Sequence, residues 1–350
     1  MPEKMSQKKS IVNPKIECRA VWKVFGDKAD ADIKSMTGAT VDEITRHAQN
    51  HGGIVGACDV SFTVGEGELF VIMGLSGSGK STVLRCIAQL QKTTLGSVML
   101  DGVDLAQCSD AELMEIRRRK MGMVFQNFGL VPHFTALENI AFPLKIRGDS
   151  ANFCRDKAQE MLELVGLNGR GDSYPKELSG GQQQRVGIAR SLAVDPELWL
   201  LDEPYSALDP LIRRQLQDEL LDLQAGLKKS IVFITHDFDE AVKLADKIAI
   251  MRDGMIVQQG TAAELLMHPA DDYVKSFVSD VARLQVLKLK DIMTPAKTKP
   301  NAALPMQKNC NLETALLAMP DGAGVIAVMD GDKLVGKVSR KDITAAVNLA

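Results

Sequence analysis

Several residues in this sequence have the types and spacing that chemistry on a phosphate requires. The run 74–81 reads GLSGSGKS and matches the pattern GxxxxGK[ST]. Its glycines let successive backbone N–H groups converge on phosphate oxygens without interference from a Cβ atom. A helix that begins near Lys80 would add the positive end of its dipole. The run therefore predicts a phosphate-binding loop.

The positions of this loop have expected roles in holding a nucleotide. Lys80 should reach the β- and γ-phosphates, and the hydroxyl of Ser81 should ligate Mg²⁺. A nucleotide with Mg²⁺ is thus the expected ligand of this loop. The remaining loop positions expected to bind phosphate are Gly74, Ser76, Gly77, Ser78 and Gly79.

An acidic pair, Asp202 and Glu203, follows the apolar run 198–201. Behind a phosphate loop, Asp202 would hold Mg²⁺ through its water shell. Glu203 would then lie beside the γ-phosphate, where it could polarise the attacking water as a general base. The alternative for such a pair is a salt bridge at the end of a strand, and the preceding loop favours the catalytic interpretation.

The elements that position these residues have the pattern of an α/β domain. Residues 15 to about 265 alternate short apolar runs with longer amphipathic stretches. The runs 69–73, 198–201 and 231–234 are apolar without alternation, which is typical of strands buried on both faces of a parallel sheet. Polar residues follow each run, as expected at the carboxyl ends of strands in open α/β sheets.

Residues 27–54 have the features of an insertion into this domain. A capping box at 40–43 (TVDE) predicts a short helix over 41–50, which Gly52 and Gly53 would end. A second capping box, SDAE at 109–112, predicts a helix that carries the basic run 117–120. Such a run could contact phosphate or lipid, but we expect it to be a solvated helix face.

Composition excludes several classes of protein. The 350 residues allow two domains, and 45% hydrophobic with 25% charged residues fit a soluble globular protein. A net charge of −3 gives no basic footprint, so no nucleic-acid partner is expected. The six cysteines contain no CxxC pair, which argues against a disulfide framework or zinc site and fits a reducing cytosol.

Neither a leader nor a membrane span is expected from the sequence. Residues 1–14 are polar, lack the apolar run of a signal peptide, and are predicted to be disordered. No segment approaches the roughly 18 consecutive apolar residues of a transmembrane helix. If the protein serves a membrane process, other chains must supply the membrane part.

The character of the chain changes at about 285. We predict a linker at 276–290 and a small domain at 291–350. Asp330-Gly331 between two apolar runs is a strong hairpin signal. The predicted elements of this domain are a helix at about 312–319, strands at 324–329 and 334–339, and a final helix.

The pentapeptide LSGGQ at 178–182 lies between the phosphate loop and the acidic pair. It predicts a second helix N-terminus with close backbone approach, and hence a second anion site. A plain helix cap with Ser179 as N-cap is the alternative. Motifs in this order resemble those of the ATP-binding cassette (ABC) ATPases. The resemblance implies a P-loop NTPase domain over 15–275 with a helical subdomain at about 127–190.

The resemblance also implies a homodimer that binds two ATP molecules. Its signature, here Ser179, Gly180, Gly181 and Gln182, faces the γ-phosphate held by the opposite subunit. The family's D-loop, which crosses the dimer interface, corresponds to 206–209, with Ser206 and Asp209 as the expected contact residues.

Further single residues acquire roles from the family. Gln126 resembles the Q-loop glutamine, which senses Mg²⁺ and water and links to the transporter partner. His236 resembles the switch histidine that contacts the γ-phosphate, and Thr82 would hydrogen-bond the α-phosphate. Phe25 matches the aromatic that stacks on adenine, and Trp22 is the competing candidate. Metal ligation by His236 is not expected, because the other histidines, at 47, 51, 133 and 268, are scattered without ligand spacing.

Within the family, the chain resembles the importer ATPases for glycine betaine, proline and choline, a group that includes relatives serving histidine. The resemblance rests on 74–79, the insertion at 27–54, SDAEL at 109–113 and DPLIR at 209–213. It implies two permease copies as partners, an extracytoplasmic substrate-binding protein, and a peripheral location at the cytoplasmic face of the bacterial inner membrane.

The C-terminal domain resembles a single CBS module, a regulatory domain that many of these ATPases carry. In GKVSRKD at 336–342, Ser339 and Asp342 could hold a ribose, although the same residues also fit a capping-box variant. The rival to a transport role is a soluble ABC ATPase acting on nucleic acid or ribosomes. The chain shows neither the long coiled coil nor the second cassette of such proteins, and its charge balance does not fit them.

Overall fold

The computed structural model describes residues 14–36, 39–206, 208–298, 300, 303–319 and 324–347. The predicted disordered segment therefore lies outside the described residues, except for Pro14. The chain divides into two compact units, one of Met1–His236 with Met251–Ile256 and the other of Asp237–Ile250 with Val257–Ala350. No helix of the described part is long and apolar enough to cross a membrane.

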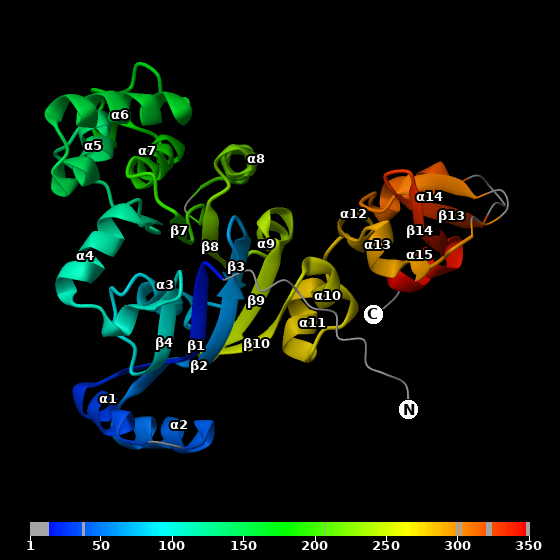
Figure 1. The fold of residues 1–350 in the computed structure, drawn as a ribbon, viewed down its shortest axis with the longest axis horizontal. Helices are drawn as coiled ribbons and strands as arrows, with labels where there is room; N and C mark the ends of the chain where they lie inside the picture. Colours follow the sequence, from blue (N-terminus) through cyan, green and yellow to red (C-terminus); the bar gives the residue numbers. More distant parts are fainter. Residues whose placement is uncertain are drawn as a thin grey trace. The chain divides into compact units, whose positions relative to one another are not determined.

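A parallel sheet forms the core of the first unit (Figure 1). Its strands β3 (Leu69–Met73), β8 (Ser230–Thr235), β7 (Leu198–Asp202) and β6 (Met121–Val124) lie in that order, and each neighbouring pair is parallel. Every residue of β3, β7 and β8 is buried, so the three predicted apolar runs are confirmed as doubly covered strands. Strands β9 (Lys247–Arg252) and β10 (Met255–Gly260) continue the sheet beside β3.

A second, antiparallel sheet was not predicted. Its order is β2-β1-β4-β5, with β1 at Ile16–Phe25, β2 at Ile54–Val64, β4 at Leu95–Leu100 and β5 at Val103–Asp104. The pairing of β1 with β2 sets Phe25 opposite Ile54. The end of β1 and the start of β2 therefore reach the same corner of the unit, although the insertion separates them in sequence.

The insertion folds as two helices, α1 (Asp27–Lys34) and α2 (Val41–Asn50), which Figure 1 shows beside the antiparallel sheet. The predicted capping box of α2 is confirmed, because Thr40 and Glu43 exchange side-chain to backbone hydrogen bonds. Helix α1 was missed, since no side chain caps it at Gly26. Both helices bury their apolar faces in one cluster with strand residues, formed by Trp22, Val24, Ala29, Ile33, Ile44, Ala48 and Cys58.

Helix α4 (Asp110–Arg119) has the predicted capping box of Ser109 and Glu112. We expected the basic run at its end to be a solvated helix face, but the structure shows that part of it is hydrogen-bonded to the protein. The guanidinium of Arg117 donates to the carbonyl oxygens of Ala88 and Gln89, and Arg119 pairs with Glu115 at 2.8 Å. The run therefore ties α4 to the chain segment that follows α3 (Lys80–Ile87).

A group of helices lies beyond the parallel sheet in Figure 1, within residues 127–190 and shortly after. Signature residue Gly180 begins the last of them. Their bounds are α5 (Ala136–Arg147), α6 (Ala151–Leu164) and α7 (Gly180–Leu192), and α8 (Pro210–Leu227) follows β7; the short helices η1 (Leu105–Gln107) and η2 (Pro175–Glu177) precede α4 and α7.

The second unit contains a mixed sheet of order β11-β14-β13-β12. The predicted hairpin is confirmed, with β13 (Val325–Asp330) antiparallel to β14 (Lys333–Ser339) and Gly331 at φ 60°. Strand β12 (Leu304–Gln307), parallel to β13, was not predicted. The other elements are α9 (Phe238–Leu244), α10 (Ala262–Met267), α11 (Asp272–Val278), α12 (Arg283–Val286), α13 (Leu289–Ile292), β11 (Thr294–Pro295), α14 (Leu312–Ala318) and α15 (Arg340–Val347).

The segment predicted as a linker, 276–290, is packed rather than extended. It holds α12 and the start of α13, and both Leu287 and Leu289 are fully buried. The boundaries proposed from the sequence, including a separate domain at 291–350, stay a prediction.

Candidate functional site

A cavity of about 610 Å³ lies at the carboxyl edge of the parallel sheet. It brings together residues that the sequence spreads over more than two hundred positions. The predicted site residues that line it are Phe25, Ser76, Gly77, Gly79, Lys80, Ser81, Thr82, Gln126, Glu203 and His236. Gly74, Ser78 and Asp202 lie beneath this lining, the latter two at 5% and 3% exposure.

The phosphate loop between β3 and α3 is shaped by backbone contacts that only glycine permits. A Cβ atom on Gly74, whose φ is 152°, would lie 2.3 Å from the carbonyl oxygen of Met251. A Cβ on Gly79 would lie 2.3 Å from the carbonyl oxygen of Gly56. Gly77 faces open space at φ 83°. The loop thus fits closely against its neighbours on one side, while Ser76 and Gly77 are exposed on the other, as an anion cradle requires.

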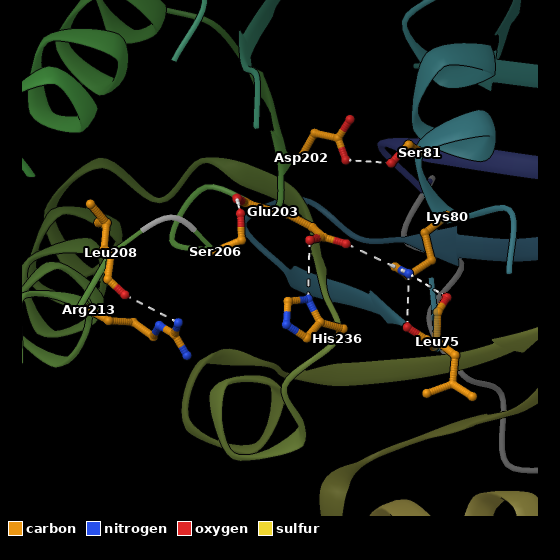
Figure 2. A network of polar contacts seen from close by, with 10 residues as sticks. Leu75, Lys80, Ser81, Asp202, Glu203, Ser206, Leu208, Arg213 and His236 are labelled. Atoms are coloured by element: carbon orange, nitrogen blue, oxygen red, sulfur yellow. Dashed lines mark hydrogen bonds and ion pairs between the residues drawn. The ribbon is translucent and has the colours of Figure 1, made fainter. Parts of the chain in front are cut away.

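Lys80 places a positive charge in the lining of the cavity, and Figure 2 shows its polar contacts. Its ammonium group donates to the carbonyl oxygens of Gly74 at 2.9 Å and Leu75 at 3.0 Å, and it lies 3.8 Å from Glu203 Oε1. The side chain is only 4% exposed. Burial lowers the pKa of Lys80, whereas the carboxylates of Glu203 and Asp202 oppose this shift. A phosphate group in the cavity would provide the ammonium with further anionic partners.

Ser81 and Asp202 form a pair of oxygen donors suited to Mg²⁺. The hydroxyl of Ser81 donates to Asp202 Oδ1 at 2.8 Å, as Figure 2 shows. Burial raises the pKa of Asp202, and the hydrogen bond from Ser81 opposes that shift. A hard divalent cation would stabilise the buried carboxylate in its ionised form. The residues present therefore fit the expected ion, with Gln126 available on the same cavity wall.

Glu203 is held in an unusual conformation between the two sides of the cavity. Its φ of 44° is in the left-handed region, and its N–H donates to the carbonyl oxygen of Ile234 on β8 at 3.1 Å. Its Oε2 lies 3.2 Å from His236 Nδ1, while the opposite oxygen faces Lys80. Backbone strain of this kind persists where surrounding structure imposes it, often at functional sites. A carboxylate fixed between an ammonium and an imidazole is well placed for general-base chemistry.

The structure separates the two candidates for stacking on a base. Phe25 lines the cavity at the end of β1, whereas Trp22 is 4% exposed within the cluster beneath the insertion. The ring of Phe25 occupies space that a side chain at Gly56 would fill, because a Cβ there would lie 2.6 Å from Phe25 Cε2. Phe25 is therefore the aromatic that can meet a ligand in this cavity.

The signature residues form the start of α7. Ser179 and Gln182 make a reciprocal capping box, with Gln182 Oε1 accepting from the N–H of Ser179 at 3.0 Å. Ser179 and Gly180 are exposed, and a Cβ on Gly181 would lie 2.8 Å from Ile212 Cγ2. In the part of the chain that the structure describes, no signature residue lines the cavity. Ser179 is thus the N-cap of α7, as the alternative interpretation of this pentapeptide stated. The N-terminus of the helix is nevertheless exposed at Ser179 and Gly180.

The predicted D-loop follows the acidic pair. The hydroxyl of Ser206 donates to the carbonyl oxygen of Glu203 at 3.1 Å (Figure 2), and Asp209 caps α8 by accepting from the N–H groups of Leu211 and Ile212. Ala207 lies outside the described residues. Ser206 thus connects the general-base candidate directly to this loop.

Two glycines that were not identified from the sequence, Gly254 and Gly56, support the site. The N–H of Gly254, in the turn between β9 and β10, donates to the carbonyl oxygen of Ser78 at 3.0 Å. Gly56 permits the close approach of Gly79 and Phe25. An isolated glycine in an apolar strand is a signal for such close backbone approach, and it could have identified Gly56.

Arg190 joins the loop after Gln126 to the signature helix. Its guanidinium donates from α7 to the carbonyl oxygens of Phe128 at 2.9 Å and Gly129 at 2.6 Å. Burial lowers the pKa of Arg190. One charged side chain therefore joins the segment that follows Gln126 to the helix that begins at the signature.

Ser339 and Asp342, the predicted ribose contacts of the second unit, hydrogen-bond each other. Asp342 Oδ2 accepts from both the N–H and the hydroxyl of Ser339 at 2.7 Å, and the hydroxyl accepts from the N–H of Asp342. This is the capping arrangement that the sequence also allowed. It accounts for both residues at the start of α15, and a ribose role stays a prediction.

Comparison with known proteins identifies close relatives. The ABC transporter family model matches residues 57–206. The trimethylamine N-oxide transport system ATP-binding protein TmoW of Pelagibacter ubique is 50% identical over 336 residues, covering 96% of this chain and 98% of that protein. The glycine betaine/proline betaine transport system ATP-binding protein ProV of Escherichia coli is 45% identical, covering 95% and 82%.

Solved structures of ABC cassettes have the same fold over 70% of this chain. The dimeric structure of MJ0796, a bacterial ABC transporter cassette, matches with a TM-score of 0.59 and 35% identity, covering 70% of this chain and 98% of that one. A dimeric post-hydrolysis state of the same cassette, bound to ADP and Pi, matches at 34% identity with the same TM-score.

Replacing Phe25 by alanine should weaken binding of an adenine nucleotide. Loss of an aromatic platform for a base costs about 1–3 kcal/mol, which is about 5- to 160-fold in affinity. Titration with a fluorescent adenine nucleotide measures the effect. Phe25→Trp should retain affinity, and Trp22→Phe, within the buried cluster, is the matched control. If Trp22→Phe lowered nucleotide affinity and Phe25→Ala did not, Trp22 would be the stacking residue instead.

Proposed function

This chain belongs to the ATP-binding subunits of ABC transporters and couples ATP hydrolysis to transport, and from that premise we propose that it drives an importer of small methylated amines. The observation that carries the mechanism is the half-site. The cavity is lined by residues that can bind a nucleotide from one side. The signature, at the N-terminus of α7, is not part of this lining. Each chain therefore contributes a phosphate loop to one ATP and a signature to another.

Within one half-site, the chemistry follows from the residues on the cavity wall. The loop amides and Lys80 bind the phosphates and stabilise the charge that develops on them. Glu203 accepts a proton from the attacking water, and His236 holds the carboxylate from its other side at 3.2 Å. Ser81 and Asp202 would hold Mg²⁺, which would supply positive charge to neutralise the phosphates.

The second half of each site would come from another copy of this chain. An exposed helix N-terminus with two glycines offers backbone N–H groups and a dipole to an anion. In a two-fold dimer the same patches meet reciprocally, so two copies complete two sites. Ser206 is hydrogen-bonded to Glu203, so a movement of Glu203 in one active site would also move the D-loop at the interface. The dimeric relatives support this arrangement.

An exposed apolar hollow next to Gln126 supports docking of a membrane permease. A cavity of about 380 Å³ is lined by apolar side chains together with arginines of α4 and α7. Met114, Phe125 and Ile146 are 46%, 40% and 49% exposed there. Clustered exposed apolar residues commonly mark an interaction site. Phe125 directly precedes Gln126, so a partner seated in this hollow would be adjacent to the nucleotide cavity.

Relatedness supports a methylated amine as the cargo. TmoW proteins of two organisms, named for trimethylamine N-oxide transport, match at 50% and 47% identity over nearly their whole length. ProV, named for glycine betaine and proline betaine, matches at 45% but extends further, since 82% of it is covered. We therefore place trimethylamine N-oxide first among the substrates, with glycine betaine next.

Glu203→Gln should preserve ATP binding and ATP-dependent dimerisation but lower turnover at least about a hundredfold, because an amide cannot accept the proton from water. Phosphate release under saturating ATP measures turnover, and gel filtration with ATP reports the dimer. Glu163→Gln, an exposed change on α6, is the matched control and should leave turnover unchanged. Hydrolysis at the normal rate by Glu203→Gln would show that another group acts as the base.

Mixing two inactive variants tests whether the signature acts on the partner's ATP. Lys80→Ala removes a phosphate contact, and Ser179→Arg blocks the signature. In a mixed dimer of the two, both defects meet in one site and the other site is intact, so hydrolysis should reappear. Ser179→Arg monomers should still bind ATP. If the signature served its own chain's nucleotide, every chain in the mixture would carry a defect and no activity would return.

Reconstitution tests the cargo separately from the ATPase. The chain, its permease and its substrate-binding protein are placed in vesicles, and ATP hydrolysis is measured with candidate substrates. Trimethylamine N-oxide should stimulate hydrolysis most, glycine betaine less, and histidine not at all. Stimulation by histidine alone would overturn the methylated-amine proposal, while the Glu203 and Ser179 experiments would still judge the ATPase mechanism.

A further inference from the structure

The insertion brings three potential metal ligands together on its two helices. Asp32 lies on α1, His47 lies on α2, and His51 is the residue that caps the C-terminus of α2. Each side chain offers one ligand atom, and the three atoms lie within 4.8 Å of one another. The two histidines are four residues apart, so they occupy one face of the helix. Sequence spacing alone does not reveal the group, because Asp32 completes it only through the packing of α1 on α2.

The ring of His47 has a nitrogen without a satisfied hydrogen bond. In the described part of the chain, His47 Nε2 is buried and has no hydrogen-bond partner. The nearest anionic atom is Asp32 Oδ2 at 3.6 Å, beyond hydrogen-bond distance. Two ligands of a tetrahedral zinc ion, each about 2.0–2.1 Å from the metal, are roughly 3.3–3.4 Å apart. The observed separation is close to that value and would accommodate an ion between the two atoms.

The ring of His51 is in the tautomer that metal binding needs. Its Nδ1 lies 2.8 Å from the carbonyl oxygen of His47. Because a carbonyl can only accept, Nδ1 must carry the proton in this hydrogen bond. In the neutral ring, Nε2 then bears the lone pair that can bind a metal. Donation of the other ring N–H to a backbone carbonyl is the usual support of a metal-binding histidine.

We propose that the insertion binds a divalent transition-metal ion, Zn²⁺ in the first instance, through Asp32, His47 and His51. Two imidazoles and one carboxylate are a donor set that suits zinc and not magnesium or calcium, which prefer oxygen ligands. The fourth position of a tetrahedral ion would hold water, since His51 is exposed. The ion would join α1, where Asp32 precedes the buried Ile33, to the C-terminal end of α2, where His47 precedes the buried Ala48.

Zinc titration of the full-length protein tests the site without reference to transport or ATP hydrolysis. Metal-free protein is titrated calorimetrically with Zn²⁺ in excess Mg²⁺, which occupies the nucleotide site. One zinc per chain should bind, and it should raise the unfolding temperature by mass action. His51→Gln and Asp32→Asn should each weaken this binding at least tenfold.

His133→Gln, which changes an exposed histidine outside the insertion, is the matched control and should bind zinc as the unaltered protein does. His51 is exposed and Asp32→Asn keeps its shape, so both variants should unfold at the normal temperature without metal. Substitution with Co²⁺ should give the intense visible absorption of a four-coordinate ion, lost in both variants. Zinc binding that is undetectable, or equal in all variants, would overturn the proposal.

Discussion

The burial of one positive charge organises the catalytic half of this protein. An ammonium withdrawn from water is stable only with close anionic or carbonyl partners. The phosphate loop supplies two carbonyl oxygens to Lys80, and β7 supplies the carboxylates of the acidic pair. These partners come from elements that meet only because the parallel strands end at one edge. This charge arrangement depends on three features: the strand order of the sheet, the glycines of the loop, and the left-handed backbone of Glu203.

The sequence predicts this half-site well because its signals are local. The loop glycines, the buried strands and the capping boxes of α2 and α4 each depend on residues within one short segment. Gln126 and His236 are weaker examples, since each follows a strand without a distinctive local pattern. Only the order of motifs along the chain assigned them, and the structure brings both to the same cavity.

Features that depend on packing between distant segments were missed. Helix α1 has no side-chain cap, and burial of Ala29 and Ile33 against β1 and α2 accounts for it. Strand β12 has only four residues and becomes a strand by pairing with β13. The basic run of α4 looked solvated because its carbonyl partners, near residue 88, lie about thirty positions away. In each case the deciding partner is remote in sequence, where period and propensity carry no information.

The two hydrogen bonds of Arg190 limit how the helical group can move. If the loop after Gln126 shifted alone, the desolvated guanidinium of Arg190 would lose both acceptors. An unsatisfied buried polar group costs about 1–3 kcal/mol, and a charged group costs more. The loop and α7 should therefore travel as one rigid body. A displacement that begins at Gln126 would then reorient the helix N-terminus at Ser179 at the same moment. Opening of one nucleotide cavity and release of the neighbouring chain's nucleotide would become a single concerted event.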